Sequence, residues 1–140
     1  MSRRSEVSAG ILAFRQKPTL ELLLAHPGGP YWHNKDEGAW SIPKGNVESG
    51  DLLICAKREF TEETGLTPAG PFTALKPLRQ KSGKMVHAFA MEADFDLSGF
   101  SSNQFEMEWP PRSGKTKTFP EIDRIAYFNV TKARRKILPG

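Results

Sequence analysis

The chain of 140 residues contains one cysteine, Cys55. A single thiol excludes an intrachain disulfide and any zinc site built from cysteines, and we interpret Cys55 as a packing residue. No apolar run approaches the length of about 20 residues that spans a bilayer. The basic start at Met1–Arg4 leads into no signal-peptide core. We therefore expect a cytoplasmic protein without membrane contact.

Repeats, low-complexity tracts and linkers are also absent from the sequence. Hydrophobic residues make up 38% of the chain and charged residues 26%, a balance typical of globular proteins. We therefore expect residues 1–140 to form one domain with a single core. The formal net charge of +4 suits a polyanionic ligand, although many basic proteins bind no nucleic acid.

The stretch from Asp51 to Leu66 predicts one helix. Asp51 can cap its start by accepting a backbone N–H, and Gly65 can provide the left-handed residue that ends it. At about 100° per residue, three carboxylates fall within one arc of this helix; they belong to Glu59, Glu62 and Glu63. The adjoining arc is apolar and is expected to be buried; it carries Leu53, Ala56 and Phe60.

The clustered carboxylates are unfavourable unless a cation lies beside them. Glu59 and Glu63 are like charges four residues apart, which destabilises a helix by about 0.2–0.5 kcal/mol. They also lie near the partly negative C-terminal end of the helix dipole. Three hard oxygen donors suit Mg²⁺ or Mn²⁺. The alternative is a solvated acidic face in which Arg58 pairs with Glu62, and the spacing alone leaves both interpretations open.

The same helix resembles the second half of the Nudix box, in which a glycine loop leads into an Arg-Glu-x-x-Glu-Glu-x-Gly sequence. Residues 58–66 read Arg-Glu-Phe-Thr-Glu-Glu-Thr-Gly-Leu, Gly45 matches the opening glycine, and residues 40–45 match the approach that many members have. The chain thus resembles the Nudix (MutT-like) hydrolase superfamily, and most of all a poorly characterised group of predicted nucleoside-polyphosphate pyrophosphohydrolases. The resemblance implies an α/β fold, the Nudix-type α/β/α sandwich with a mixed β-sheet.

One departure from the family pattern lies between the glycine and the helix. The pattern has five residues between the glycine and its first glutamate and seven more before the arginine. Here five residues lead from Gly45 to Asp51, a shorter acid, and only six separate Asp51 from Arg58. Either Asp51 replaces the glutamate, or the glutamate is deleted and Asp51 only caps the helix. We favour the cap, because a loop absorbs a deletion whereas a helix would rotate its face.

The resemblance implies Mg²⁺-dependent or Mn²⁺-dependent hydrolysis of a phosphoric anhydride bond. The substrate would be a nucleoside di-, tri- or polyphosphate, a dinucleoside polyphosphate, or a nucleoside diphosphate linked to another group. Glu59, Glu62 and Glu63 would be metal ligands, and Glu59 or Glu62 would take a proton from the attacking water. The Gly45 carbonyl would be a further ligand, and Arg58 would steady the carboxylates.

Further candidate residues lie outside the helix. Basic side chains that could contact phosphate are those of Lys44, Arg112 and Lys115. Many Nudix enzymes recruit another glutamate from a later strand, and Glu106 and Glu108 share one side of such a strand. We prefer Glu106 as this distal metal ligand. The alternative is an exposed acidic strand edge that deters aggregation.

Runs of apolar and alternating residues predict strands on both sides of the acidic helix. The expected strands are Val7–Phe14, Leu20–Ala25, Trp40–Ile42, Phe72–Arg79, Met85–Ala93, Phe105–Trp109 and Ile125–Phe128, and a last helix is expected at Thr131–Leu138. Residues 31–33, Tyr-Trp-His, either stack on a nucleobase or close a small core.

Two other functions are compatible with the sequence. A nucleotide-binding regulatory module without turnover is favoured by the shortened loop and disfavoured by the intact Arg-Glu and Glu-Glu pairs. An enzyme that acts on RNA 5′ ends is permitted by the net charge, but no stripe of basic and aromatic residues supports it.

Overall fold

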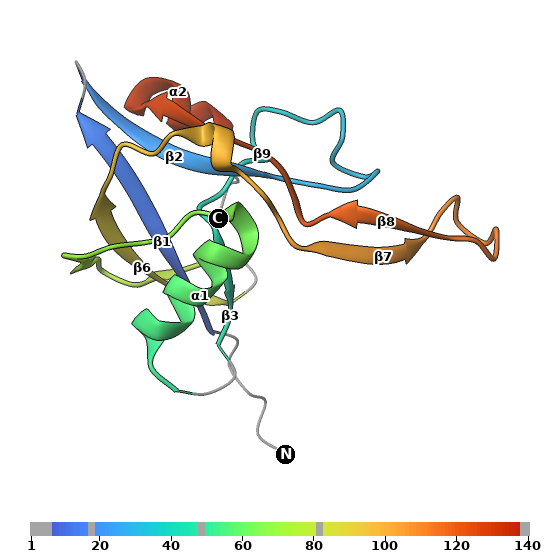
Figure 1. Cartoon of the computed structure of the whole chain (residues 1–140), viewed down its shortest axis with the longest axis horizontal. Coiled ribbons are helices and arrows are strands. Elements are labelled where there is room, and N and C mark those ends of the chain that lie inside the picture. The colour runs from blue at the N-terminus through green and yellow to red at the C-terminus, as the bar shows by residue number, and fades with distance from the viewer. Residues whose placement is uncertain (1–6, 17–18, 48–49, 81–82, 138–140) are drawn as a thin grey trace.

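The computed structural model describes residues 7–16, 19–47, 50–80 and 83–137. Its elements are β1 (Val7–Gln16), β2 (Leu20–Pro27), β3 (Lys44–Asn46), α1 (Leu52–Thr64), β4 (Thr73–Ala74), β5 (Leu78–Arg79), β6 (Met85–Glu92), a 3₁₀ turn (Leu97–Gly99), β7 (Gln104–Glu108), β8 (Thr116–Pro120), β9 (Ile122–Asn129) and α2 (Val130–Lys136). They form a mixed sheet and a separate two-stranded ribbon (Figure 1).

Strand β1 is the centre of the sheet. It pairs in parallel with β6 and antiparallel with β2 and the short β3. The strand order is β4-β6-β1-β2-β9, with β3 beside β1 and β5 beside β6. One parallel pair among antiparallel neighbours makes the sheet mixed, as expected.

The two helices cover opposite faces of this sheet. Successive residues of a strand point to opposite faces. Leu23 of β2 lies in the core beneath α1, together with Ala56 and Phe60 of that helix. The next residue, Leu24, lies in a second core with Ala133 of α2. This arrangement confirms the predicted α/β/α sandwich.

Helix α1 begins and ends where the sequence predicts. The Oδ1 atom of Asp51 accepts the N–H of Ile54 at 3.0 Å, so Asp51 is the N-cap. Gly65 has a φ of 73° in the left-handed region, and its N–H donates to the Thr61 carbonyl at 2.8 Å. Of the expected buried arc, Ala56 and Phe60 are fully buried and Leu53 is half-buried.

The prediction of a strand at Trp40–Ile42 is wrong. Trp40 and Ser41 form only isolated bridges, to Ile137 and Ala25, and Pro43 just beyond them has no N–H to continue a ladder. The strand begins at Lys44 instead. The expected strand Phe72–Arg79 is divided into β4 and β5, because Pro77 between them has no N–H to give to a ladder.

Strands β7 and β8 form an antiparallel ribbon apart from the main sheet. The ring centroids of Phe105 and Phe119 are 5.9 Å apart across it. Figure 1 shows the ribbon extending beyond the sheet, with its turn at the end farthest from α1. The sequence did not predict β8, because Thr116, Lys117 and Thr118 are polar and exposed on both faces.

The remaining expected strands are confirmed, although β1, β2 and β9 are longer than predicted. The last helix begins at Val130, one residue earlier than predicted, and ends at Lys136, whereas the predicted end at Leu138 lies outside the described residues. No helix in the described part of the chain has the length and the apolar character needed to cross a bilayer. Cys55 is buried and belongs to the core beneath α1.

Candidate active site

Two glycines bring β3 close to its neighbours. Gly45 pairs with Ala9 of β1, and a Cβ on Gly45 would lie 2.1 Å from Cδ of Glu59. A Cβ on Gly10 would lie 2.5 Å from the Pro43 carbonyl oxygen. Only glycine fits such close approaches. The Glu59 side chain therefore lies directly over the Gly45 backbone, which explains why the box needs a glycine here.

The three carboxylates of α1 differ in exposure. The side chain of Glu59 is 17% exposed and that of Glu62 is 41% exposed, whereas Glu63 is buried. The Arg58 guanidinium lies 3.4 Å from Oε2 of Glu59 and 3.7 Å from Oε2 of Glu62. The pairing of Arg58 with Glu62 was the alternative to a metal site. The structure shows that one arginine contacts two of the carboxylates, which is also the arrangement expected of a residue that steadies them.

Glu63 is the most perturbed carboxylate of the site. Burial, together with the negative charges of Glu59 and Glu121, raises the pKa of Glu63 to about 8. The Lys44 ammonium and a hydrogen bond from the Lys44 backbone act in the opposite direction. Burial in turn lowers the pKa of Lys44. The positive charge of Lys44 therefore does not offset burial and the neighbouring carboxylates, and the pKa of Glu63 stays raised.

A fourth carboxylate, that of Glu121, joins the cluster from the turn between β8 and β9. Burial and the negative charges of Glu59 and Glu62 raise its pKa. Its backbone N–H donates to the Asn103 carbonyl, and the Asn103 N–H donates to the Glu62 carbonyl, at 2.8 and 2.9 Å. These bonds use a carbonyl that the end of α1 leaves free, and they fix Glu121 beside the helix.

The chemistry of these residues fits a divalent cation. The negative charge of Glu59 lies close enough to contribute to the raised pKa values of Glu63 and Glu121, and Glu62 also contributes to that of Glu121. Hard oxygen donors are those that Mg²⁺ and Mn²⁺ prefer. As the side chains stand, no three His, Cys, Asp or Glu residues of the described ranges are arranged as a ligand set.

A cavity of about 240 Å³ adjoins the carboxylates. Its lining includes Glu63, Lys44 and the indole of Trp32. Trp32 is half-buried, and the Lys35 ammonium lies 5.2 Å from its ring centroid. An acid, a base and an aromatic face thus meet in one recess, so Trp32 is the residue of the 31–33 segment that lies beside the cluster.

The structure does not bring the other predicted residues to this cluster. Glu106 is exposed on the β7–β8 ribbon, opposite Thr118. Glu108 accepts the backbone N–H groups of Arg112 and Gly114, both at 3.0 Å, so it stabilises the ribbon turn. Arg112 and Lys115 are exposed in that turn, at the end of the ribbon farthest from α1 (Figure 1).

Sequence reasoning missed Glu121. The only local signal is an acidic residue between Pro120 and the apolar start of β9 at Ile122. That signal is weak because the carboxylates of α1 that Glu121 joins are more than fifty residues earlier in the chain. A distal carboxylate as a metal ligand stays a prediction, and the later acid that lies beside the α1 carboxylates is Glu121 instead of Glu106.

The chain was compared with known proteins. The family model of the NUDIX domain matches residues 4–139. An RNA pyrophosphohydrolase of Caulobacter vibrioides is 36% identical over 59 residues, which cover 38% of this chain and 34% of that protein. The chain thus matches about a third of the length of this curated relative.

Solved structures share the fold at low identity. The NUDIX domain of Shewanella oneidensis NrtR, complexed with ADP ribose, has a TM-score of 0.64 at 12% identity and covers 99% of this chain and 81% of its own. A MutT/nudix family protein of Listeria innocua has a TM-score of 0.62 at 21% identity, covering 98% and 87%. A C. elegans Ap4A hydrolase has a TM-score of 0.57 at 21% identity, and the match covers 90% of this chain and 82% of that one.

Proposed function

This chain belongs to the NUDIX family, and we propose that it is a pyrophosphohydrolase that cleaves a phosphoric anhydride bond of a nucleoside phosphate with Mg²⁺ or Mn²⁺. The observation that carries the proposal is the meeting of Glu121 with the carboxylates of α1. A helix face alone can be a solvated acidic surface, but a fourth carboxylate delivered from a distant turn adds repulsion that a bound cation relieves.

Five oxygen-bearing groups would hold the metal. They are the carboxylates of Glu59, Glu62, Glu63 and Glu121 and the carbonyl of Gly45. When bound, the metal neutralises charge on the anhydride and lowers the pKa of a water molecule. The close packing of Glu59 on Gly45 holds a carboxylate beside that carbonyl.

The chain's own groups perform the remaining steps. Glu59 or Glu62 accepts the proton of the attacking water, since both are at least partly accessible. Arg58, which contacts both, keeps their oxygens oriented. Lys44 lines the cavity beside Glu63 and offers a positive charge to a phosphate group. Single-residue contributions of this kind are worth about 10²–10⁴-fold in rate.

The identity of the relatives supports a nucleotide as the substrate. Their names refer to an RNA pyrophosphohydrolase, to ADP ribose and to Ap4A. ADP ribose and Ap4A share a phosphoric anhydride attached to a nucleoside. We therefore propose a nucleoside polyphosphate or a nucleoside diphosphate derivative as the substrate.

A nucleotide-binding regulatory module is the second candidate. Two observations favour it: the box is one residue short, and the α1 carboxylates are not arranged as a ligand set as they stand. Asp51 caps α1 and so provides no obvious replacement for the missing glutamate.

A substrate panel separates the two candidates. The protein is incubated with nucleoside di- and triphosphates, dinucleoside polyphosphates, nucleotide sugars and 5′-triphosphorylated RNA, with Mg²⁺ or Mn²⁺, and the products are identified. We expect metal-dependent hydrolysis that Glu62→Gln lowers by orders of magnitude with little change in melting temperature. Undiminished turnover in Glu62→Gln would overturn the assignment. Nucleotide binding without any hydrolysis would establish the regulatory module.

A further inference from the structure

A second cavity, of about 390 Å³, is lined in part by Pro120 and Asp123, which lie on either side of Glu121 in the sequence. Its volume falls within the range of about 300–1,000 Å³ typical of small-molecule sites. The lining residues come from the loop after β2 and from the junction of β8 and β9; they are Gly29, Pro30, His33, Phe119, Pro120 and Asp123. None of the four clustered carboxylates is among these lining residues.

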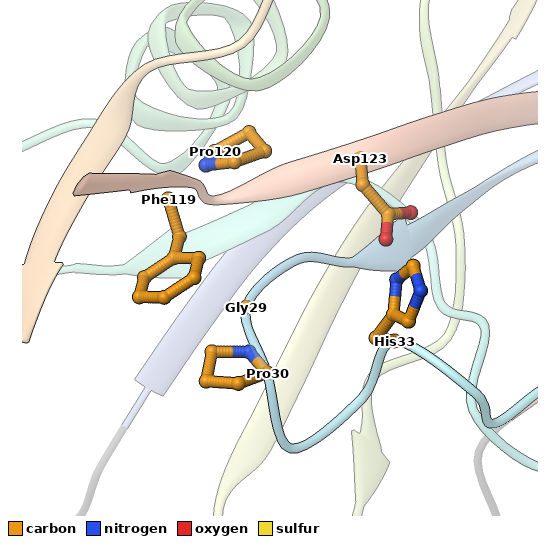
Figure 2. Close-up of a pocket in the computed structure, with 6 residues that line it drawn as sticks. All are labelled: Gly29, Pro30, His33, Phe119, Pro120 and Asp123. Carbon is orange, nitrogen blue, oxygen red and sulfur yellow. The ribbon is translucent and has the colours of Figure 1, made fainter. Parts of the chain in front are cut away.

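The walls combine flat apolar surfaces with one polar end. Figure 2 shows the Phe119 and Pro30 rings on one side and the His33 and Asp123 side chains together on the other. Apolar faces with a few polar groups at one edge are typical of sites for heteroaromatic rings. Stacking of a base on an aromatic side chain such as Phe119 contributes to affinity for every base, so selectivity must come from the polar end.

The polar end is built on buried contacts. Both ring nitrogens of His26, which is fully buried, face acceptors: Nδ1 lies 2.8 Å from Oδ1 of Asp123, and Nε2 lies 2.5 Å from the Lys35 carbonyl. Nε of Arg124 lies 3.4 Å from the same Oδ1 atom. These contacts hold Asp123 in place and anchor the loop that contains His33. In the described ranges no hydrogen bond reaches Oδ2 of Asp123.

A fixed carboxylate accepts hydrogen bonds but donates none, so the edge of the ligand that meets Asp123 must carry donors. Guanine has two adjacent donors, the N1–H and the N2 amino group. Adenine would place the lone pair of N1 against the carboxylate, and cytosine would do the same with N3. His33 can donate to the O6 or N7 acceptors that guanine also has.

The cavity is also close to the reacting groups. Asp123 follows Glu121 by two residues, which is about 7 Å along an extended chain, and Pro120 directly precedes it. The same short segment therefore carries both a wall of this cavity and a member of the carboxylate cluster. Given the proposed function, on which this inference rests, we infer that the cavity is the base site of the substrate and that it selects guanine nucleotides.

The first test compares the hydrolysis of GTP and ATP in Mg²⁺. We expect kcat/KM for GTP to exceed that for ATP by about tenfold or more, the discrimination typical of a two-donor contact to a base edge. Asp123→Asn should reduce that preference, because the amide presents a donor to N1–H or N2 of guanine. Equal kcat/KM values for the two wild-type reactions would overturn the inference.

Asp123→Asn also loses the contact to His26 and can fail to fold, so a second pair of variants is needed. Phe119→Ala should raise KM for GTP about tenfold, in line with the loss of one stacking contact. Tyr31→Ala is the matched control, since Tyr31 is an aromatic residue of the same loop, 58% exposed, that does not line the cavity. Equal KM changes in Phe119→Ala and Tyr31→Ala would contradict the inference.

Binding of the nucleosides alone separates this inference from the proposed function. Guanosine and adenosine are titrated calorimetrically into the wild type without divalent metal. Tighter binding of guanosine that Phe119→Ala abolishes and Tyr31→Ala retains supports the cavity even where no nucleotide is hydrolysed. Equal or undetectable binding of both nucleosides, alongside active hydrolysis, would place the base elsewhere.

Discussion

Helix α1 and the turn between β8 and β9 supply the same kind of group to the site by different means. Glu59, Glu62 and Glu63 lie together because one helix repeats its direction every three to four residues. Glu121 lies with them only because Asn103 links its backbone to the carbonyl of Glu62. The helix therefore determines most members of this carboxylate cluster, whereas long-range docking determines whether Glu121 joins it.

The largest effect is expected from Gly45→Ala. The added Cβ would lie 2.1 Å from Cδ of Glu59, so the carboxylate must move away from the Gly45 carbonyl. We expect turnover to fall about 100-fold, as for other displacements of about 1 Å in active sites. Gly99→Ala is the control, because its Cβ would meet its nearest neighbour, Leu66, at an ordinary 3.6 Å. Wild-type turnover in Gly45→Ala would show that this packing is not required.

A smaller effect is expected at the turn. Glu121→Gln removes one charge from the cluster while the backbone bonds to Asn103 and Gly28 remain. Turnover should fall about 10- to 100-fold, the range typical of groups that support a metal site. Glu106→Gln on the exposed ribbon should leave turnover unchanged. The reverse order of effects would restore Glu106 as the distal carboxylate.

Glu63 makes the metal-free protein sensitive to pH. Its pKa of about 8 in the folded protein lies above the ordinary value of 4.5, so its stabilising contribution is complete below the ordinary pKa and is lost as pH rises toward 8. Over that window the free energy of unfolding falls by up to about 1.4 kcal/mol per pH unit. Glu63→Gln should not show this loss. Urea unfolding in the presence of a chelator measures the free energy of unfolding of both proteins across this pH range. Parallel pH profiles for the wild type and Glu63→Gln would contradict the assignment.

The smallest effect is expected at the start of the helix. Asp51→Asn should change the free energy of unfolding by less than about 0.5 kcal/mol and retain most activity, because asparagine caps a helix about as well as aspartate. Asp51→Ala should cost about 1 kcal/mol. A large loss of metal affinity in Asp51→Asn alone would mean that Asp51 replaces the missing glutamate of the box.

The parts of the site that follow from local periodicity could be predicted from the sequence. The span and caps of α1 and its buried arc depend on spacing and on the left-handed conformation of Gly65, whereas the place of Gly45 beside the helix followed from the resemblance. The mixed sheet followed from the resemblance and from the order of the strands. Arg58 contacts two carboxylates as the same spacing allows.

The parts that depend on long-range contacts could not be predicted. β8 has no apolar alternation and exists because β7 pairs with it. Glu121 looks like any exposed acid beside a proline until its backbone is traced to Asn103 and Glu62. Trp40 lies in a stretch with the pattern of a strand, but it forms only an isolated bridge, to Ile137 near the other end of the chain. In each case the deciding partner is distant in the sequence.

The most direct test of the account is a calorimetric titration with Mn²⁺. It compares the wild type, Glu121→Gln and Glu106→Gln, and it tests the claim that α1 and the β8–β9 turn hold one divalent cation. We expect the dissociation constant to rise about 10- to 100-fold in Glu121→Gln and to stay unchanged in Glu106→Gln. Equal affinities in all three proteins, or no Mn²⁺ binding by the wild type, would contradict the claim.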